Sequence, residues 1–470
     1  MITIQDIHGL VRHGRPEFLN LKFKSAKTVS TDSRNVTSGQ IFFALRGEKF
    51  DGHSFVAEAI KKGAVCAVVD KRWFRENKEI AAKLPLVVVE DTGIALGDLA
   101  RIYRRKFDIP MIAVGGSNGK TTTKEMVARV LSRKFKILKT SGNHNNQIGV
   151  PLTIFELKKS YEAAVVEIGT NHFGEIERLC EVLDPNAGLI TNIGREHLEF
   201  FKNLSGVRKE EGKLFEYLAK TKGTAFLNAD DKNLAGMSKT LKRKFGYGFQ
   251  SGSSVRRNLS GRLFGFDAMG CALFEIKYNG KTELIHLRVP GIDNAANALA
   301  AAAVGFYYGV SAVEIKKALE TYKSYEKRMQ IVKTGGVTIL NDTYNSNPES
   351  TIAALRWLAM VRAKGKRIVV LGDMLELGES SKREHQKIGK EIAGQKFDCL
   401  FTFGKLAREI AISADSSLET ESFDDKQRLS GKLLETVSSG DFVLVKGSRG
   451  MKMEEVVSAL VSRLQTGGAR

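Results

Sequence analysis

Cysteine is scarce in this sequence of 470 residues, and the few cysteines present lie far apart. The four are Cys66, Cys180, Cys271 and Cys399, with no C-x-x-C spacing among them. Disulfide frameworks and zinc sites use closely spaced cysteines, so the sequence argues against both. We expect four reduced, mostly buried thiols.

Long apolar runs are also missing. No stretch approaches the ~18 apolar residues of a membrane-spanning helix, and the opening residues MITIQD lack the basic and apolar regions of a signal peptide. We therefore expect a cytoplasmic protein. A hydrophobic content of 42% with 27% charged residues is ordinary for globular proteins and gives no sign of disorder. A chain of this length predicts two to four domains.

Acidic residues are too few to balance the basic ones. The 53 Asp and Glu against 73 Lys and Arg leave a net charge of +20, which could indicate nucleic acid, an anionic membrane surface or small acidic substrates as partners. The basic residues are scattered, and the runs 101–106 and 241–244 interleave with apolar positions at helical spacing. Such runs are typical of solvated helix faces. We expect no nucleic-acid partner and a monomeric protein.

A glycine-rich loop is the most informative feature that the chain does contain. Residues 111–114 are apolar, residues 115–122 read GGSNGKTT, and a helical pattern follows. In such a loop the backbone N–H groups can face a polyphosphate, Lys120 can reach terminal phosphate oxygens and Thr121 can ligate a metal. The strict G-x-x-x-x-G-K-[ST] pattern would need glycine at Val114. We still predict a nucleoside triphosphate site.

The pattern along the chain divides it into three α/β segments. Residues 1–108 predict a small α/β domain, with strands at 40–45 and 64–69 and a helix near 55–62. Residues 109–325 predict a central P-loop domain with a parallel sheet, followed by antiparallel strands over 273–289 and an alanine-rich helix at 294–306. A Gly- and Ser-rich stretch, 246–266, precedes those antiparallel strands. Residues 326–470 alternate strands with helices, which predicts a Rossmann-like, doubly wound fold.

Reactive side chains follow three strands of the central segment. Lys120 and Thr121 follow the first, Glu167 ends another, and His197 follows a third. Because ligands bind beyond the carboxyl ends of parallel strands, these side chains could hold ATP phosphates and Mg²⁺ together. Taken singly, Glu167 could equally be a helix cap, and a lone histidine is more often structural.

Longer motifs in all three segments resemble the Mur ligase family. They are STDSR at 30–34, FDGH at 50–53, GSNGKTT at 116–122, SGNHNNQIGVP at 141–151, TNIGREHLE at 191–199, NDTYNSNP at 341–348, LGDMLELG at 371–378 and VKGSRG at 445–450. The resemblance spans nearly the whole chain. It implies ATP-dependent amide synthesis through an acyl phosphate, joining D-alanyl-D-alanine to UDP-N-acetylmuramoyl-tripeptide for peptidoglycan.

The resemblance also implies roles for individual residues. Lys120, Glu167, His197 and Glu211 would be catalytic, and Mg²⁺ would be held by Thr121, Glu167, His197 and Glu211. The ATP site would comprise Gly116, Ser117, Asn118, Gly119, Lys120, Thr121, Thr122, Asn294, Asn297, Arg328 and Asp342. The UDP-peptide and dipeptide would contact Asp32, Ser33, Arg34, Asn143, Asn145, Asn146, Asn345, Asn347, Lys446, Ser448 and Arg449. The asparagine clusters are also good turn formers.

Two positions depart from the family pattern. The family usually has a carbamylated lysine where this chain has Glu211, and we expect the Glu211 carboxylate to supply the negative group without modification. Glu210 or Lys209 could take that role if the register shifts, and a solvated helix face is the alternative. The second departure is Asp293, where the family commonly has histidine before the asparagine.

Other functions remain compatible with the motifs. The nearest alternatives keep the chemistry and change the amino donor: a Mur ligase that adds the third peptide residue, or a folylpolyglutamate synthetase. A basic, nucleic-acid-dependent P-loop ATPase is a more distant alternative, and steep salt dependence would reveal it. A catalytically inactive binding protein would not need Lys120, Thr121, Glu167 and His197 together.

Overall fold

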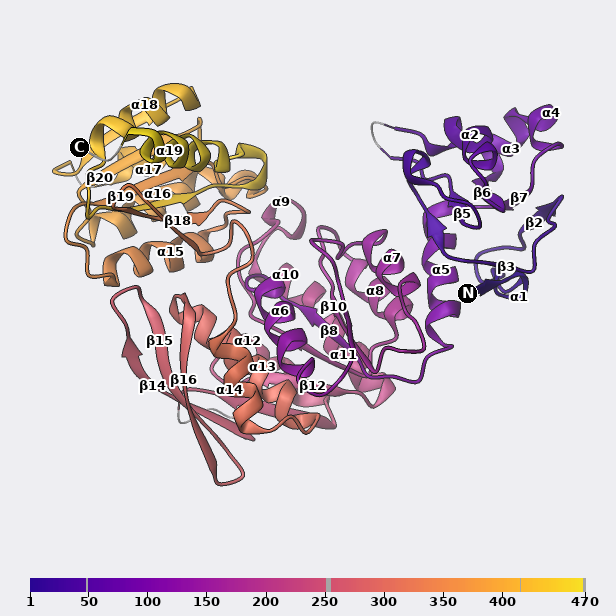
Figure 1. Ribbon diagram of the computed structural model, residues 1–470, viewed down its shortest axis with the longest axis horizontal. Helices are drawn as coiled ribbons and strands as arrows, with labels where there is room; N and C mark the ends of the chain where they lie inside the picture. The colour runs from indigo at the N-terminus through magenta and orange to yellow at the C-terminus, as the bar shows by residue number, and fades with distance from the viewer. Residues whose placement is uncertain (48–49, 251–254, 415, 468–470) are drawn as a thin grey trace. The chain divides into compact units, whose positions relative to one another are not determined.

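The computed structural model describes residues 1–47, 50–250, 255–414 and 416–467 (Figure 1). Contacts between residues divide the chain into two compact units. Unit 1 comprises Met1–Ala113, Phe135–Thr170 and Gly174–Gly188, and unit 2 comprises Val114–Lys134, Asn171–Phe173 and Leu189–Arg470. Within the described residues, no helix is both long and apolar enough to cross a membrane.

The first 90 residues of unit 1 form a five-stranded sheet in the order β2-β7-β6-β5-β4. Strands β4 to β7 pair in parallel, and β2 joins β7 antiparallel. The elements are β1 (Ile2–Thr3), α1 (Ile4–His8), β2 (Glu17–Leu19), β3 (Ser25–Ala26), β4 (Val29–Ser30), β5 (Ile41–Phe43), α2 (Val56–Lys61), β6 (Cys66–Asp70), α3 (Lys71–Glu76), α4 (Lys78–Ala81) and β7 (Leu86–Val89). A core that includes Phe42, Val56 and Val88 holds this sheet to its helices.

The remainder of unit 1 is built on three helices that contact one another. They are α5 (Thr92–Arg104), α7 (Gly149–Phe155) and α8 (Glu175–Leu183). Alongside them, β9 (Ile137–Lys139) pairs in parallel with β10 (Ala163–Glu167). The buried guanidinium of Arg104 donates to the Leu183 carbonyl at 3.0 Å, which ties the end of α5 to the end of α8.

Strands β8 (Met111–Gly115) to β16 belong to one nine-stranded sheet, in the order β16-β15-β14-β13-β12-β11-β8-β10-β9. The further strands are β11 (Ala187–Ile190), β12 (Thr224–Asn228), β13 (Arg243–Gly248), β14 (Leu259–Phe266), β15 (Cys271–Tyr278) and β16 (Lys281–Pro290). Strands β12, β13 and β14 pair in parallel, whereas β14, β15 and β16 are antiparallel neighbours. The Gly- and Ser-rich stretch thus contributes most of two strands, and its residues 251–254 lie outside the described part.

Helices α6 (Lys120–Leu131) and α13 (Ile292–Tyr307) lie side by side in unit 2 (Figure 1). Small residues on α13 allow this close approach. At Gly305, for example, a Cβ would lie 2.4 Å from Cγ1 of Val130 on α6. The other helices here are α9 (Leu198–Phe201), α10 (Leu204–Glu211), α11 (Lys213–Thr221), α12 (Lys232–Met237) and α14 (Ala312–Glu320). The packing fixes α6, and with it the loop that precedes it.

The C-terminal part of unit 2 is a six-stranded sheet in the order β17-β18-β22-β19-β20-β21. Its elements are β17 (Gln330–Thr334), β18 (Val337–Asp342), α15 (Pro348–Met360), β19 (Arg367–Gly372), α16 (Ser381–Ala393), β20 (Cys399–Phe403), α17 (Arg408–Ser413), β21 (Glu419–Phe423), α18 (Lys426–Thr436), β22 (Phe442–Lys446) and α19 (Glu454–Gly467). All neighbours are parallel except β17 and β18. Helices α18 and α19 pack on one face, and Figure 1 shows α15 on the other side.

Most of the predicted elements match the structure within a few residues. The antiparallel strands expected over 273–289 are β15 and β16, and the alanine-rich helix is α13. One local expectation is wrong: residues 241–244 lead into strand β13 and do not form a helix face. All four cysteines are free and buried, as expected.

Candidate active site

The phosphate loop between β8 and α6 needs glycine at two positions. Gly116 has φ +110°, and a Cβ there would lie 2.4 Å from Oγ1 of Thr191. Gly119 has φ +80° and precedes the first residue of α6, where a Cβ would lie 2.7 Å from Oδ1 of Asn297. Both the left-handed backbone and the close neighbours exclude a larger side chain. The loop is therefore built for close approach of backbone to a ligand.

Asn192 holds the tip of this loop from the end of β11. Its Oδ1 accepts the Asn118 N–H at 3.0 Å, and its Nδ2 donates to the Asn118 carbonyl at 2.9 Å. The hydroxyl of Ser117 lies beside the same strand end, accepting the Gly194 N–H at 2.8 Å. Buried hydrogen bonds of this kind fix a loop that lacks regular structure.

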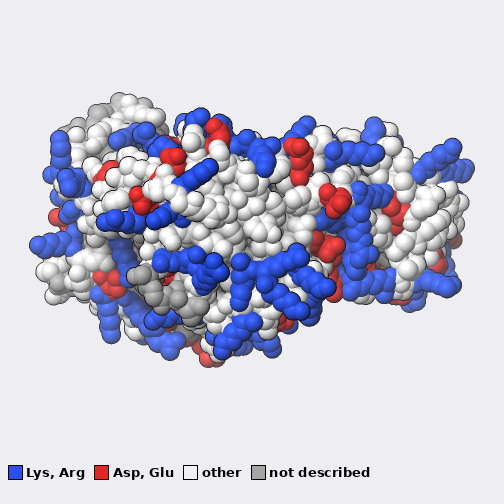
Figure 2. Space-filling model, turned by 90° about the horizontal axis from the view of Figure 1, so that it is seen from below, with Lys and Arg blue, Asp and Glu red and all other residues white. Residues whose placement is uncertain are grey.

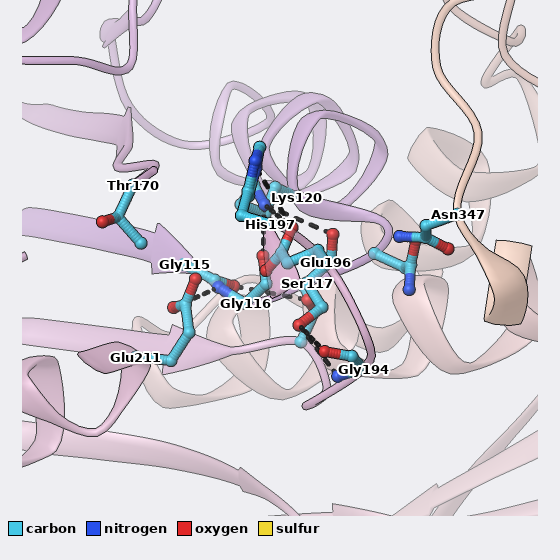
Figure 3. A network of polar contacts seen from close by, with 12 residues as sticks. Gly115, Gly116, Ser117, Lys120, Thr170, Gly194, Glu196, His197, Glu211 and Asn347 are labelled. Atoms are coloured by element: carbon cyan, nitrogen blue, oxygen red, sulfur yellow. Dashed lines mark hydrogen bonds and ion pairs between the residues drawn. The ribbon is translucent and has the colours of Figure 1, made fainter. Parts of the chain in front are cut away.

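Lys120 folds back over the loop (Figure 3). Its Nζ donates to the Gly116 carbonyl at 2.5 Å and lies 3.3 Å from Oε2 of Glu196. The Glu196 side chain is 9% exposed, and its Oε1 is buried without a hydrogen-bond partner in the described part of the chain. A phosphate that entered the loop would find a cation already placed there.

Glu211, at the end of α10, is the most buried carboxylate of the site, with 0% exposure. Its Oε2 accepts the Gly116 N–H at 2.7 Å, and its Oε1 is buried with no hydrogen-bond partner among the described residues. Burial raises the pKa of Glu211 to about 8, with Lys120 acting in the opposite direction and Glu196 in the same one. Glu210 is also buried, at 1% exposure. Neither residue belongs to a solvated helix face.

His197 lies on a left-handed residue (φ +48°) just before α9. Its Nδ1 is 2.6 Å from Oε2 of Glu376, and its Nε2 is 3.9 Å from Oε2 of Glu196. The His197 ring holds the pKa of the Glu376 carboxyl below its ordinary value. The histidine thus links the P-loop neighbourhood to the 371–378 motif of the C-terminal sheet.

Two buried asparagines on the first turns of α13 approach the phosphate loop. Asn297 lies against Gly119, and its Nδ2 is 3.2 Å from Oδ1 of Asn294. Asn294 in turn donates to the Pro290 carbonyl at 2.7 Å. The structure therefore places both predicted nucleotide residues at the loop, with Asn297 next to it.

The start of α15 brings the C-terminal sheet to the same loops. Asn347, the N-cap of α15, donates from Nδ2 to Oδ1 of Asn118 at 2.9 Å. Arg195 donates from Nε to Glu349 on α15 at 2.7 Å and from Nη1 to Glu384 on α16 at 2.9 Å. Both bonds are charge-assisted, and the Glu384 carboxylate is desolvated at 1% exposure, whereas Glu349 is 34% exposed. They join the loop after β11 to two helices.

Two of the predicted residues at the end of the C-terminal sheet, Lys446 and Asp342, bond each other. Lys446 is 2% exposed and bonds Oδ2 of Asp342 at 2.6 Å and the Asn345 carbonyl at 2.9 Å. Oδ1 of Asp342 accepts the Met329 N–H at 2.9 Å. Ser448 is buried as well, whereas Arg449 has a side chain that is 60% exposed. Arg449 is thus the residue of the 445–450 motif that faces solvent.

In unit 1, Glu167 is a second buried carboxylate with a spare oxygen. It is 1% exposed, Oε1 accepts from Nδ2 of Asn145 at 2.8 Å, and its backbone N–H donates to the Thr140 hydroxyl. Oε2 has no hydrogen-bond partner within the residues that the structure describes. Oδ1 of Asn146 accepts the N–H of Gly149, the first residue of α7, at 2.9 Å, and Asn143 is exposed. The asparagine motif therefore both supports Glu167 and forms a turn.

The 30–34 motif of unit 1 is an exposed turn. Asp32 accepts bonds from the backbone N–H of Arg34 and from its guanidinium at 2.8 Å, which lowers the pKa of the Asp32 carboxyl to about 2. The Arg34 side chain is 85% exposed, while Ser33 is buried. The turn presents a guanidinium to solvent.

The residues of this site include oxygen ligands that suit a magnesium ion. No group of three or more His, Cys, Asp or Glu in the described part of the chain is arranged to hold a metal by itself. Mg²⁺ commonly takes only one or two carboxylates and completes its shell with water and phosphate oxygens. The spare buried oxygens of Glu196 and Glu211, both in unit 2, are ligand atoms of the kind it prefers. The donor set fits a nucleotide-bound ion.

Sequence reasoning overlooked several residues that organise this site. Asn192, Arg195 and Glu196 stand in the quoted 191–199 motif, beside the histidine that drew attention. Glu349 and Glu384 lie outside all of the motifs that resemble the family. Their roles depend on which loops the C-terminal sheet meets, and the sequence contains no local sign of that.

Family models match three parts of the chain. The Mur ligase family catalytic domain matches residues 25–104, the Mur ligase middle domain residues 114–305, and the Mur ligase glutamate ligase domain residues 327–449. The chain belongs to the Mur ligase family. The resemblance carried by the sequence motifs is thereby confirmed.

Similar proteins narrow the likeness to one branch of that family. The UDP-N-acetylmuramoyl-tripeptide–D-alanyl-D-alanine ligases of Bacillus subtilis and Escherichia coli are each 35% identical to this chain, over 92% of it and 93% of their own lengths. A crystal structure of MurF from Acinetobacter baumannii has a TM-score of 0.86 at 30% identity, covering 98% of both chains. MurF from Thermotoga maritima in complex with ADP has a TM-score of 0.82 at 27% identity, covering 93% of this chain and 98% of that one. The α/β fold class is confirmed, whereas the boundaries at 108 and 325 stay predictions.

Proposed function

We infer that this protein is an ATP-dependent, amide-forming ligase that joins D-alanyl-D-alanine to UDP-N-acetylmuramoyl-tripeptide in peptidoglycan precursor synthesis. The observation that carries the inference is the agreement of the relatives over nine-tenths of the chain, each named as a ligase for these two substrates. The phosphate loop with Lys120 supports it, because this chemistry starts with phosphoryl transfer from ATP.

The reaction has two steps that balance. The terminal carboxylate of the tripeptide attacks the γ-phosphorus of ATP, which releases ADP and leaves an acyl phosphate. The amine of D-alanyl-D-alanine then attacks the acyl carbon, phosphate leaves, and the amine loses a proton as the amide forms. In the first step two anions must approach each other, so the site must offset their repulsion.

Residues of unit 2 are suited to the first step. We propose that the N–H groups of Gly116 to Thr122 at the start of α6 bind the phosphates, and that Lys120 turns from the Gly116 carbonyl to a phosphate oxygen. Asn294 and Asn297 would line the nucleotide site, and Arg328 would reach the γ-phosphate. Asp342 is already bonded to Lys446, so its remaining lone pairs would receive a ribose hydroxyl.

Magnesium would be held within unit 2 by Thr121, His197 and the spare oxygen of Glu211. A bound Mg²⁺ supplies charge neutralisation at the phosphates. Glu211 would act there as an unmodified carboxylate, in the place where the family usually has a carbamylated lysine. Because Oε2 is fixed on the Gly116 N–H, Oε1 is the oxygen that remains to face a cation.

The organic substrates would be bound by the more exposed motifs. We propose that Arg34, with Asp32 and Ser33, contacts the UDP portion, and that Asn143, Asn145 and Asn146 contact the sugar-peptide. Arg449 would pair with the dipeptide carboxylate, since a guanidinium matches carboxylate geometry. Asn345 and Asn347 would also contact the organic substrates. Lys446 and Ser448 are both buried and would hold the 445–450 loop in place beneath Arg449.

Location and assembly also belong to this proposal. We expect a cytoplasmic monomer, since ATP and a nucleotide-linked peptide are both cytoplasmic metabolites. Figure 2 shows Lys and Arg side chains outnumbering Asp and Glu on the visible face, as the net charge of +20 requires. We propose no nucleic-acid partner, and the DNA arm of the test below checks this.

The test measures ADP release and product mass with purified protein, ATP, Mg²⁺ and UDP-N-acetylmuramoyl-tripeptide. D-alanyl-D-alanine should support full turnover, and single amino acids should not. A folate with glutamate, and single-stranded DNA, are the parallel arms for the alternative functions. The Lys120→Ala variant should lose turnover. Full activity of that variant, or equal turnover with a single amino acid, would contradict the proposal.

A further inference from the structure

Two arginines from different segments share one aromatic ring at the end of the C-terminal sheet. The guanidinium carbon of Arg328 lies 3.7 Å from the centre of the Tyr344 ring, and that of Arg449 lies 5.5 Å from it. Arg328 precedes β17, Tyr344 follows β18 and Arg449 follows β22. Both distances fall within the range of cation–π attraction.

The fold explains why these three side chains meet. The Tyr344 N–H donates to the Lys327 carbonyl at 3.0 Å, which places the ring beside Arg328. Strands β18 and β22 run parallel in a register that pairs Asp342 with Lys446, so the segments after both strands leave the sheet at the same edge. The arrangement therefore follows from strand pairing and does not depend on chance contact of long side chains.

The charges around the ring are not balanced. Oε1 of Glu454 lies 3.0 Å from Nζ of Lys327 and 3.3 Å from Nη1 of Arg449, so one carboxylate serves two cations. Nε of Arg328 is buried and has no hydrogen-bond partner in the part of the chain that the structure describes. Three cations against one carboxylate leave a local surplus of positive charge that anionic ligands would complete.

We propose that Tyr344 is a positioning residue whose ring holds Arg328 for a phosphate of ATP and Arg449 for the carboxylate of the dipeptide. The proposal rests on the proposed function and names the residue that couples its two anion subsites. A free arginine samples many rotamers, and a ring that orders its guanidinium lowers the entropy lost on binding. One ring thus sets the spacing of two guanidiniums that serve two different substrates.

The test compares Tyr344→Phe, which keeps the ring, with Tyr344→Leu and Tyr344→Met, which remove it. The matched control is Phe403→Leu, which removes a ring 5.5 Å from Nζ of Lys426 in the same sheet. ATP affinity is measured by titration calorimetry without acceptor substrates, and KM for D-alanyl-D-alanine is measured by ADP release. Melting curves identify any variant that does not fold.

The expected result is a loss in both non-aromatic variants. ATP affinity should fall by about threefold to thirtyfold, the range that a cation–π contact provides, and KM for the dipeptide should rise with a smaller change in kcat. Tyr344→Phe and Phe403→Leu should stay near wild type. A folded Tyr344→Leu or Tyr344→Met protein with unchanged ATP affinity and unchanged KM would overturn the proposal. A wild-type protein that binds ATP but forms no amide with D-alanyl-D-alanine would instead refute the proposed function, and the ATP titration would still test the ring.

Discussion

Replacing Glu211 by glutamine should stabilise the protein at pH 8 while it cripples the ligase. The wild-type carboxylate is fully buried and touches a single N–H donor, that of Gly116, through Oε2. A glutamine carbonyl can accept the same bond. The substitution therefore removes the cost of burying a charge, and with it the negative charge that we assign to the cation.

The size of the effect follows from the pKa of this carboxyl. Burial raises it from 4.5 to about 8, and each unit corresponds to about 1.4 kcal/mol, so ionised Glu211 costs at most about 5 kcal/mol. Between these two values the unfolded chain binds fewer protons at this position than the folded one. The free energy of unfolding therefore falls as the pH rises from about 5 to 8. The new glutamine would bury an amide N–H group without an acceptor, which offsets part of this gain, so we expect about 2 kcal/mol or more for Glu211→Gln at pH 8.

The assay is urea unfolding of wild type and variant at pH 6 and pH 8 without Mg²⁺, beside ligase turnover at saturating substrates. The control is Glu216→Gln, because the Glu216 side chain is 50% exposed and should change neither measurement appreciably. A Glu211→Gln protein that is no more stable than wild type at pH 8 would refute the argument from burial. Unaffected turnover would discard the assignment of Glu211 to the cation.

Two further predictions concern the loops that the C-terminal sheet supports. Arg195→Gln removes two charge-assisted bonds, worth about 2 kcal/mol after allowance for the 30% exposure of the Arg195 side chain, so kcat/KM should fall roughly thirtyfold. Arg133→Gln, which breaks an exposed ion pair, should leave it near wild type, and equal kinetics for both variants would contradict this. His385 is buried, and its Nε2 accepts the Met374 N–H at 3.0 Å. Desolvation lowers the pKa of His385 from 6.5, so the free energy of unfolding should decline as the pH falls below about 6.5. Denaturant midpoints at pH 7.5 and 5.5 check this, and an equal decline in His385→Gln would count against it.

Local patterns in the sequence predicted the elements of the fold well. A continuous apolar run such as 442–445 suits a strand buried on both faces, and the structure has β22 there. The glycines of the phosphate loop were also predictable, since φ values of +110° and +80° admit little else. The structure of residues 241–244 was not predictable, because a short basic run between apolar residues fits a helix face and an exposed strand end alike.

Several properties of the site could not be read from the chain. The sequence left open whether Glu211 lies on a solvated face, and burial by residues distant in sequence decided the question. Lys446 was expected to face a substrate, yet strand pairing places it on Asp342.

By itself, the sequence determined the order of strands and helices, the phosphate loop and the family, because each depends on residues that are neighbours along the chain. The tertiary structure alone decided which carboxylates lose their water, which cations are already paired and which ring holds two arginines. Those properties depend on desolvation and on contacts between segments far apart in the sequence, as between Tyr344 and Arg449, or between Gly116 and Glu211.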